Sequence, residues 1–168
     1  QIRNLHVNSD PQASIKVNHK AIITWRDVNV SKLKFWVISN VKTNNHITKI
    51  RKKVDFPIKS DEFREYSVPT NFIDLNSKIT QQAHELVEGE DDLYFAVFKI
   101  AEWIRINIKY DLNTLTEKAV QKSTWVFENR EGVCDEMTNL FISMLRSVGI
   151  PSRFVSGSVY NDAGKDWG

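Results

Sequence analysis

Cysteine, glycine and proline are scarce in this sequence, and each scarcity excludes a class of protein. Among 168 residues there are one cysteine, six glycines and four prolines. The lone cysteine, Cys134, cannot form an internal disulfide, and no paired-cysteine or Cys/His pattern for zinc remains. Few glycines and prolines, together with 41% hydrophobic residues, exclude a disordered chain. We therefore expect a folded globular chain without a metal or another cofactor.

Long apolar runs and an excess of one charge are also missing. No stretch approaches the roughly 18 consecutive apolar residues that indicate a membrane-spanning helix. The net charge is only +2, which does not predict a nucleic-acid partner. We interpret the one basic cluster as the solvated side of a strand; it consists of Lys49, Arg51, Lys52 and Lys53.

Alternating apolar residues characterise the N-terminal part of the chain. They occur in three runs, around Ile15–Ile23, Leu33–Val37 and Val54–Ile58. A period of two predicts strands, and turn-like residues separate the runs. We therefore expect one antiparallel sheet with hairpin connections, which forms an N-terminal β module in residues 1–70.

Helical periodicity replaces the alternation in residues 71–168. Helices are expected from Ser77 to near Gly89 and from about Asp91 to Asn107, where acidic residues favour the N-terminus. The predicted fold class is therefore α+β, with the β module followed by a largely helical second domain. Trp103 and Trp125 are interpreted as core residues, although aromatic side chains also line substrate clefts; Trp167 is a third candidate for a cleft mouth.

The segment around Cys134 carries the strongest functional signal. Apolar residues recur at three- and four-residue steps from Cys134 to Val148, which predicts a helix packed by its Met137, Phe141 and Leu145 face. Gly149 is a typical C-terminal cap. Cys134 then lies at the helix N-terminus, half turned toward the core, where the helix dipole favours a thiolate. Inert core packing is the alternative for a lone cysteine on an apolar face.

Several separate pieces of the sequence resemble one known family. The pieces NREGVCDEMTNLF and MLRSVGIPSRFVSG, followed by Tyr160, resemble the core of the transglutaminase-like superfamily. Upstream, AEWIRINIKYD and STWVFENREG are similar to that family's lead-in to its nucleophile, and all pieces occur in the family's order. The resemblance extends from about Leu75 to the end, and it aligns Cys134 with the catalytic cysteine.

The resemblance implies a papain-like arrangement of Cys, His and Asp that forms a thioester with an amide substrate. In the family, the base histidine follows the strand that corresponds to SRFVSGSVY. Here Lys165-Asp166-Trp167-Gly168 ends the sequence at that point, and all four histidines precede Cys134: His6, His19, His46 and His84. We therefore interpret the chain as the nucleophile-bearing part of the domain, truncated before its β half is complete.

No other residue is a convincing base from the sequence alone. His84 lies inside the resembling region, but it is interpreted as an exposed histidine on a helix. Asp135 and Glu136 are interpreted as first-turn acids that favour the helix dipole. Because a thiol needs an oriented base, we expect the chain by itself to be inactive.

The functional expectation is a cysteine acyltransferase or hydrolase that acts on amide bonds of proteins or peptides. A non-catalytic interaction or structural module that keeps the fold is the main alternative. A cysteine peptidase of unrelated geometry is a third. The sequence does not decide between water and an amine as acceptor.

Overall fold

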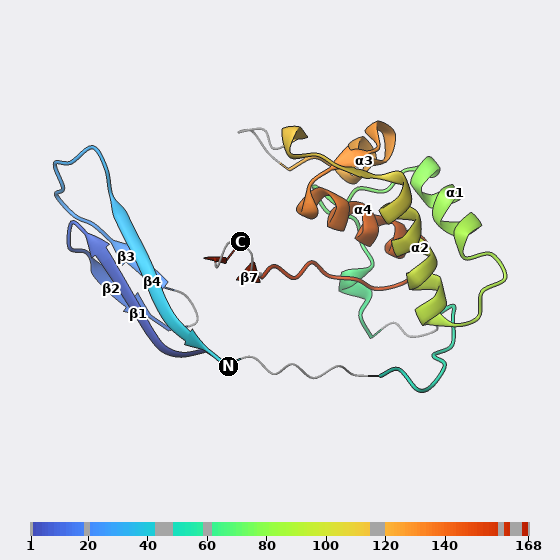
Figure 1. The fold of residues 1–168 in the computed structure, drawn as a ribbon, viewed down its shortest axis with the longest axis horizontal. Helices are drawn as coiled ribbons and strands as arrows, with labels where there is room; N and C mark the ends of the chain where they lie inside the picture. Colours follow the sequence, from blue (N-terminus) through green and yellow to red (C-terminus); the bar gives the residue numbers. More distant parts are fainter. Residues whose placement is uncertain are drawn as a thin grey trace. The chain divides into compact units, whose positions relative to one another are not determined.

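The computed structural model describes residues 2–18, 21–42, 49–58, 62–114, 120–157, 160–161 and 166–167. The chain divides into two compact units, Gln1–Lys49 and Ile50–Gly168, which are described separately (Figure 1). The α+β class is confirmed: the described residues form antiparallel strands in the first unit and four α-helices in the second. The domain boundary expected at residue 70 stays a prediction.

The described residues of the first unit form two separate two-stranded antiparallel sheets. β1 (Ile2–Asp10) pairs with β4 (Lys34–Val41), and β2 (Ser14–Val17) pairs with β3 (Ala21–Thr24). The expectation of one sheet is therefore wrong. The alternating run Ile15–Ile23 is split, because the chain reverses between Val17 and Ala21 and aligns them as partners.

None of the described side chains in residues 1–49 is buried. In β4 the apolar residues Phe35, Trp36, Val37 and Ile38 are exposed on both faces of the strand. Two-stranded sheets have no second layer to cover them and contribute little stability alone. The structural core of the described residues consequently lies in the second unit.

The third alternating run, Val54–Ile58, is not a strand, which corrects the sequence interpretation. It contributes one isolated bridge, between Asp55 and Asp92. The Phe56 N–H donates to the Asp91 carbonyl at 3.1 Å, and the Leu93 N–H donates to the Val54 carbonyl at 2.8 Å. The segment therefore pairs with the turn before a helix rather than with another strand. The basic residues at 51–53 are exposed as expected, but they too lie outside any strand.

Two of the expected helices form close to their predicted bounds. α1 spans Ser77–Leu86, and its N-cap is Asn76, whose Oδ1 accepts from the Ile79 N–H at 2.8 Å. α2 spans Leu93–Asn107, where the Asp92 carboxylate accepts from the Tyr94 N–H at 2.9 Å. Each cap satisfies an N–H that has no partner within the helix.

Short elements lead from α2 to the cysteine helix. β5 (Lys109–Tyr110) is followed by a 3₁₀ turn at Leu112–Thr114, and α3 spans Ser123–Asn129. β6 (Glu131–Gly132) then pairs in parallel with β5. An earlier 3₁₀ turn occupies Arg64–Tyr66.

The central helix is α4, Cys134–Ser147, which contacts α1, α2 and α3 (Figure 1). Leu140 and Met144 are completely buried, and Gly149 follows with the positive φ of 77° expected of a C-terminal cap. The predicted face is partly wrong, because Met137 and Phe141 are only partly buried. Neighbours on several sides bury polar residues of α4 as well: Glu136, Asn139, Ser143 and Arg146.

After α4 the chain is extended, and β7 (Tyr160–Asn161) pairs with β8 (Asp166–Trp167) in antiparallel fashion. The side chain of Trp167, expected near a cleft mouth, lies outside the described part of the chain. None of the described helices has the length and apolar character needed to cross a membrane.

Candidate active site

Cys134 is the first residue of α4 and is exposed, rather than half turned toward the core. The preceding residue, Val133, is extended and buried, so the chain passes from a fixed strand directly into the helix. The Cys134 thiol lies 3.6 Å from Oδ1 of Asp135, to which it donates. This thiol is free and reachable by a solute.

Glu136 fixes the first turn of α4 from inside the protein. Its side chain is 1% exposed, and its carboxylate accepts three hydrogen bonds. The Thr114 hydroxyl donates at 2.8 Å, the Gln121 N–H at 2.9 Å and the Val133 N–H at 3.0 Å. A buried carboxylate is tolerated when donors surround it in this way. Glu136 is thus a tether: its carboxylate joins the first turn of α4, which carries Cys134, to the segment before α3. The sequence predicts only an acidic residue that favours the helix dipole.

The turn before Cys134 is held at a strand pair. The Lys109 N–H donates to the Arg130 carbonyl at 2.8 Å, and the Asp111 N–H donates to the Gly132 carbonyl at 3.1 Å. A larger residue would crowd Glu136 at the position of Gly132, because a Cβ there would lie 3.1 Å from Cβ of Glu136 and 3.3 Å from its Oε2. The small residue lets the strand approach the tether closely.

Stacked aromatic rings support the same turn. Trp103 and Phe127 stack with centroids 5.6 Å apart, and the Arg130 guanidinium lies 4.7 Å and 4.3 Å from the two ring centroids. Burial lowers the pKa of Arg130 from its ordinary value. Trp103 and Trp125 both pack against the core, in agreement with their sequence interpretation.

A cavity of about 300 Å³ opens beside Cys134. Asp135, the residue after Cys134, lines this cavity, and its Oδ1 lies 3.6 Å from the thiol, whereas Cys134 itself is not one of the lining residues. Its apolar wall includes Phe72, Ile73 and Phe154, which sequence reasoning did not single out. Because these residues are distant in the sequence, only the folded chain reveals the cavity.

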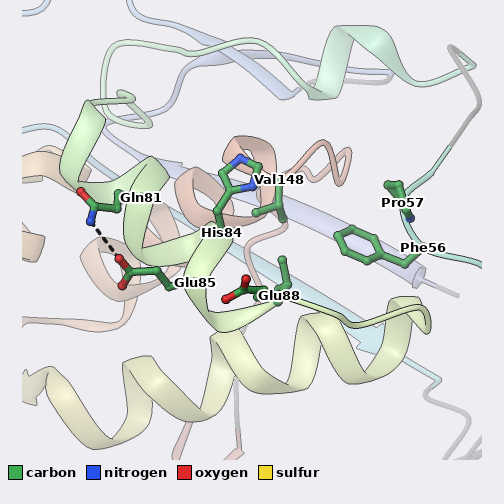
Figure 2. Close-up of a pocket in the computed structure, with 8 residues that line it drawn as sticks. Phe56, Pro57, Gln81, His84, Glu85, Glu88 and Val148 are labelled. Atoms are coloured by element: carbon green, nitrogen blue, oxygen red, sulfur yellow. Dashed lines mark hydrogen bonds between the residues drawn. The ribbon is translucent and has the colours of Figure 1, made fainter.

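His84 does not lie near Cys134. It is exposed on α1 and lines a different pocket, of about 520 Å³, together with Phe56 and Val148 (Figure 2). Val148 caps the far end of α4, and a helix rises about 1.5 Å per residue, so this pocket is about 20 Å from the cysteine end. His84 therefore cannot act as the base for this thiol.

The other three histidines of the sequence lie in residues 1–49. His19 and His46 lie outside the described residues, and His6 belongs to β1 in the first unit. Within the described ranges no group of His, Cys, Asp and Glu side chains is arranged to hold a metal ion.

Comparisons with known proteins agree with the resemblance seen in the sequence. The model of the transglutaminase-like superfamily matches residues 80–168. An uncharacterized protein of Mycobacterium leprae (strain TN) is 29% identical over 101 residues, which make up 60% of this chain and 35% of that protein. The chain thus spans about a third of that relative's length.

A solved structure from Cytophaga hutchinsonii, described as a "Putative Cysteine Protease", is similar over 99% of this chain with a TM-score of 0.64. The sequence identity is 14%, so the likeness shows a shared fold alone, and the chain covers 60% of that protein.

Proposed function

Because the chain belongs to the transglutaminase-like superfamily, we propose that Cys134 is the nucleophile of an enzyme that acts on amide bonds of proteins or peptides. One observation carries the proposal: within the matched residues, the exposed thiol is the first residue of α4. A cavity opens beside it, and a buried tether at Glu136 fixes its turn. An inert core cysteine would need neither exposure nor this support.

The proposed reaction passes through a thioester. The Cys134 thiolate attacks the amide carbonyl, the C–N bond breaks, and the amine leaves with a proton. Water then attacks the thioester, which gives a carboxylic acid and restores the thiol, or a second amine attacks and forms a new amide. The first N–H groups of a helix have no carbonyl partner within it, so the start of α4 suits the negative charge that develops on the carbonyl oxygen.

We further propose that residues 1–168 alone do not turn over substrate. In the family's order, the base histidine and its aspartate come after the position of β8. The one histidine among the described residues of the second unit is His84. It belongs to α1 and lines a pocket with Val148, at the opposite end of α4 from Cys134. A thiol without a base within hydrogen-bond reach loses the roughly 10²- to 10⁴-fold gain that general-base assistance supplies.

The test compares the 168-residue chain with a chain extended beyond residue 168 by residues that supply a histidine and an aspartate in the family's order, which is called the parent protein below. We expect release of ammonia from protein glutamine, or coupling of a fluorescent amine to casein, with the parent protein and not with the short chain. Cys134→Ala should abolish turnover in the parent protein. His84→Ala is the matched control and should leave turnover unchanged, because His84 lies about 20 Å from the thiol along α4.

A non-catalytic interaction module is the second candidate, and the distance between His84 and Cys134 favours it for the isolated chain. A folded parent protein that contains His and Asp but shows no Cys134-dependent turnover would establish this candidate and refute the enzyme. Cys134-dependent turnover by residues 1–168 alone would refute the proposal that the short chain is inactive.

A further inference from the structure

The cavity lined by Asp135, the residue after Cys134, has the dimensions of a pocket for one side chain, and part of its wall is anchored by hydrogen bonds. About 300 Å³ is at the lower end of the range for small-molecule sites, so a single side chain fits it better than a cofactor does. The segment that carries Phe72 is anchored to α3 and α4. The Ser123 N–H donates to the Phe72 carbonyl at 3.0 Å, the Thr124 N–H donates to Asp74 Oδ1 at 3.0 Å, and the Ser143 hydroxyl donates to the Asp74 carbonyl.

Asn139 supplies an independent indication of a ligand. Its side chain is 6% exposed, lines the cavity, and has no hydrogen-bond partner among the described residues. Every fully enclosed side-chain nitrogen and oxygen in the described ranges does have a partner. The Asn139 amide must therefore face open space, and the cavity is the space that it lines. Because solvent reaches this amide only through the cavity, it is available to hydrogen-bond to an occupant that displaces the water.

The other lining residues indicate the chemistry of the occupant. Phe72 and Phe154 are each 39% exposed and line the apolar wall, where the face of an aromatic ring attracts a cation. The one charged residue in the lining is Asp135, whose Oδ1 lies 3.6 Å from the Cys134 thiol. A long apolar stem with a cationic, hydrogen-bonding end complements all of these groups.

We infer that this cavity is a specificity pocket that binds an arginine or lysine side chain of the substrate, next to the amide on which Cys134 acts. As a substrate pocket it rests on the function proposed above. The aromatic wall holds the stem, the Asn139 amide oxygen accepts a hydrogen bond from the guanidinium or ammonium group, and the Asp135 carboxylate attracts its charge. A glutamate at the same place would bring a second negative charge beside Asp135.

The test measures peptide binding to the 168-residue chain with Cys134→Ala, so that no reaction can interfere. The probes are short capped peptides that contain glutamine flanked by arginine, by norleucine or by glutamate, and the affinities are measured by calorimetry. We expect the arginine peptide to bind about tenfold more tightly than the norleucine peptide, and the glutamate peptide to bind most weakly.

Variants assign the preference to the pocket. Asp135→Asn and Phe154→Ala should each reduce the preference for arginine while binding of the norleucine peptide changes less. Asp91→Asn and Phe95→Ala alter the same kinds of group at exposed sites on or near α2, and they should change nothing. Because Asn139 is nearly buried and its substitution endangers folding, its part is followed without mutation, by the shift of its side-chain amide resonances on peptide addition.

Equal affinities for the three peptides, a preference that survives both pocket variants, or unmoved Asn139 resonances would each overturn the inference. Its failure is distinct from failure of the proposed function. Cys134-dependent turnover with no arginine preference refutes the pocket alone. An arginine preference in a parent protein without turnover refutes the enzyme and leaves a peptide-binding cavity.

Discussion

Glu136 and Asp135 are neighbours in the sequence, yet the structure gives these carboxylates opposite surroundings. Asp135 is exposed beside the Cys134 thiol, whereas Glu136 is 1% exposed and accepts three hydrogen bonds. The difference follows from helix geometry, because adjacent residues point about 100° apart around the axis. From the sequence both are first-turn acids, and only the partners at Thr114 and Gln121 separate a tether from a surface charge.

Glu136→Ala should destabilise the chain strongly, by about 3 kcal/mol or more. The substitution leaves the Thr114 hydroxyl and two backbone N–H groups without their acceptor, and each unpaired buried donor costs about 1–3 kcal/mol. The free energy of unfolding is measured by urea unfolding, followed by circular dichroism. Asp135→Ala is the matched control, and it should lower this free energy by less than about 1 kcal/mol. Equal, small losses for both variants would show that the tether is not needed for folding.

Exposure of the thiol gives a second prediction at the residue scale. Iodoacetamide should label Cys134 in the folded chain, because the residue is exposed at the start of α4. Mass spectrometry of the folded and urea-unfolded chain gives the two rates, and Cys134→Ser confirms the site. Labelling that requires unfolding would place the thiol in the core and remove the basis of the proposed nucleophile.

At the scale of elements, the sequence predicts the helices better than the strands. Capping residues and the spacing of apolar residues predict approximately where α1, α2 and α4 begin and end, because both signals are local in the sequence. Alternation identifies extended segments such as β4, but it does not choose their partners, so the division into two small sheets was not predictable. The candidate site divides in the same way: Cys134 is identified as a candidate from its local motif, whereas the cavity requires residues from four distant segments, represented by Phe72, Val120, Asn139 and Phe154.

The orientation of α4 can be tested by paired substitutions. Leu140→Ala should cost about 2–5 kcal/mol, because Leu140 is completely buried in the cluster formed by the four helices. Phe141→Ala should cost less than the roughly 3–5 kcal/mol of a fully buried aromatic, since Phe141 packs at the edge of that cluster and is partly exposed. Urea unfolding of the two variants gives both values. A larger loss for Phe141 than for Leu140 would contradict the rotation of the helix about its axis.

At the scale of the whole molecule, the two units differ in how they can be stabilised. Every buried apolar residue of the described chain belongs to residues 50–168, from Ile73 to Ile150. Hydrophobic burial is the dominant favourable term in folding, so the helical unit carries the core that the described residues form. The first unit instead has exposed apolar side chains such as Phe35 and Trp36 on its strands.

Residues 50–168 should therefore fold without residues 1–49. We expect the shortened chain to unfold cooperatively, with a thermal midpoint within a few degrees of that of the 168-residue chain, because deletion removes no residue of the helical core. Calorimetry of both chains gives the comparison, and retained labelling of Cys134 in the shortened chain shows that the site survives. A control deletion to residue 76 removes Ile73 and the Asp74 carbonyl that accepts from Ser143, so it should unfold at a clearly lower temperature. Loss of cooperative unfolding already on removal of residues 1–49 would show that the first unit is part of the core and would overturn the division of the chain into two units.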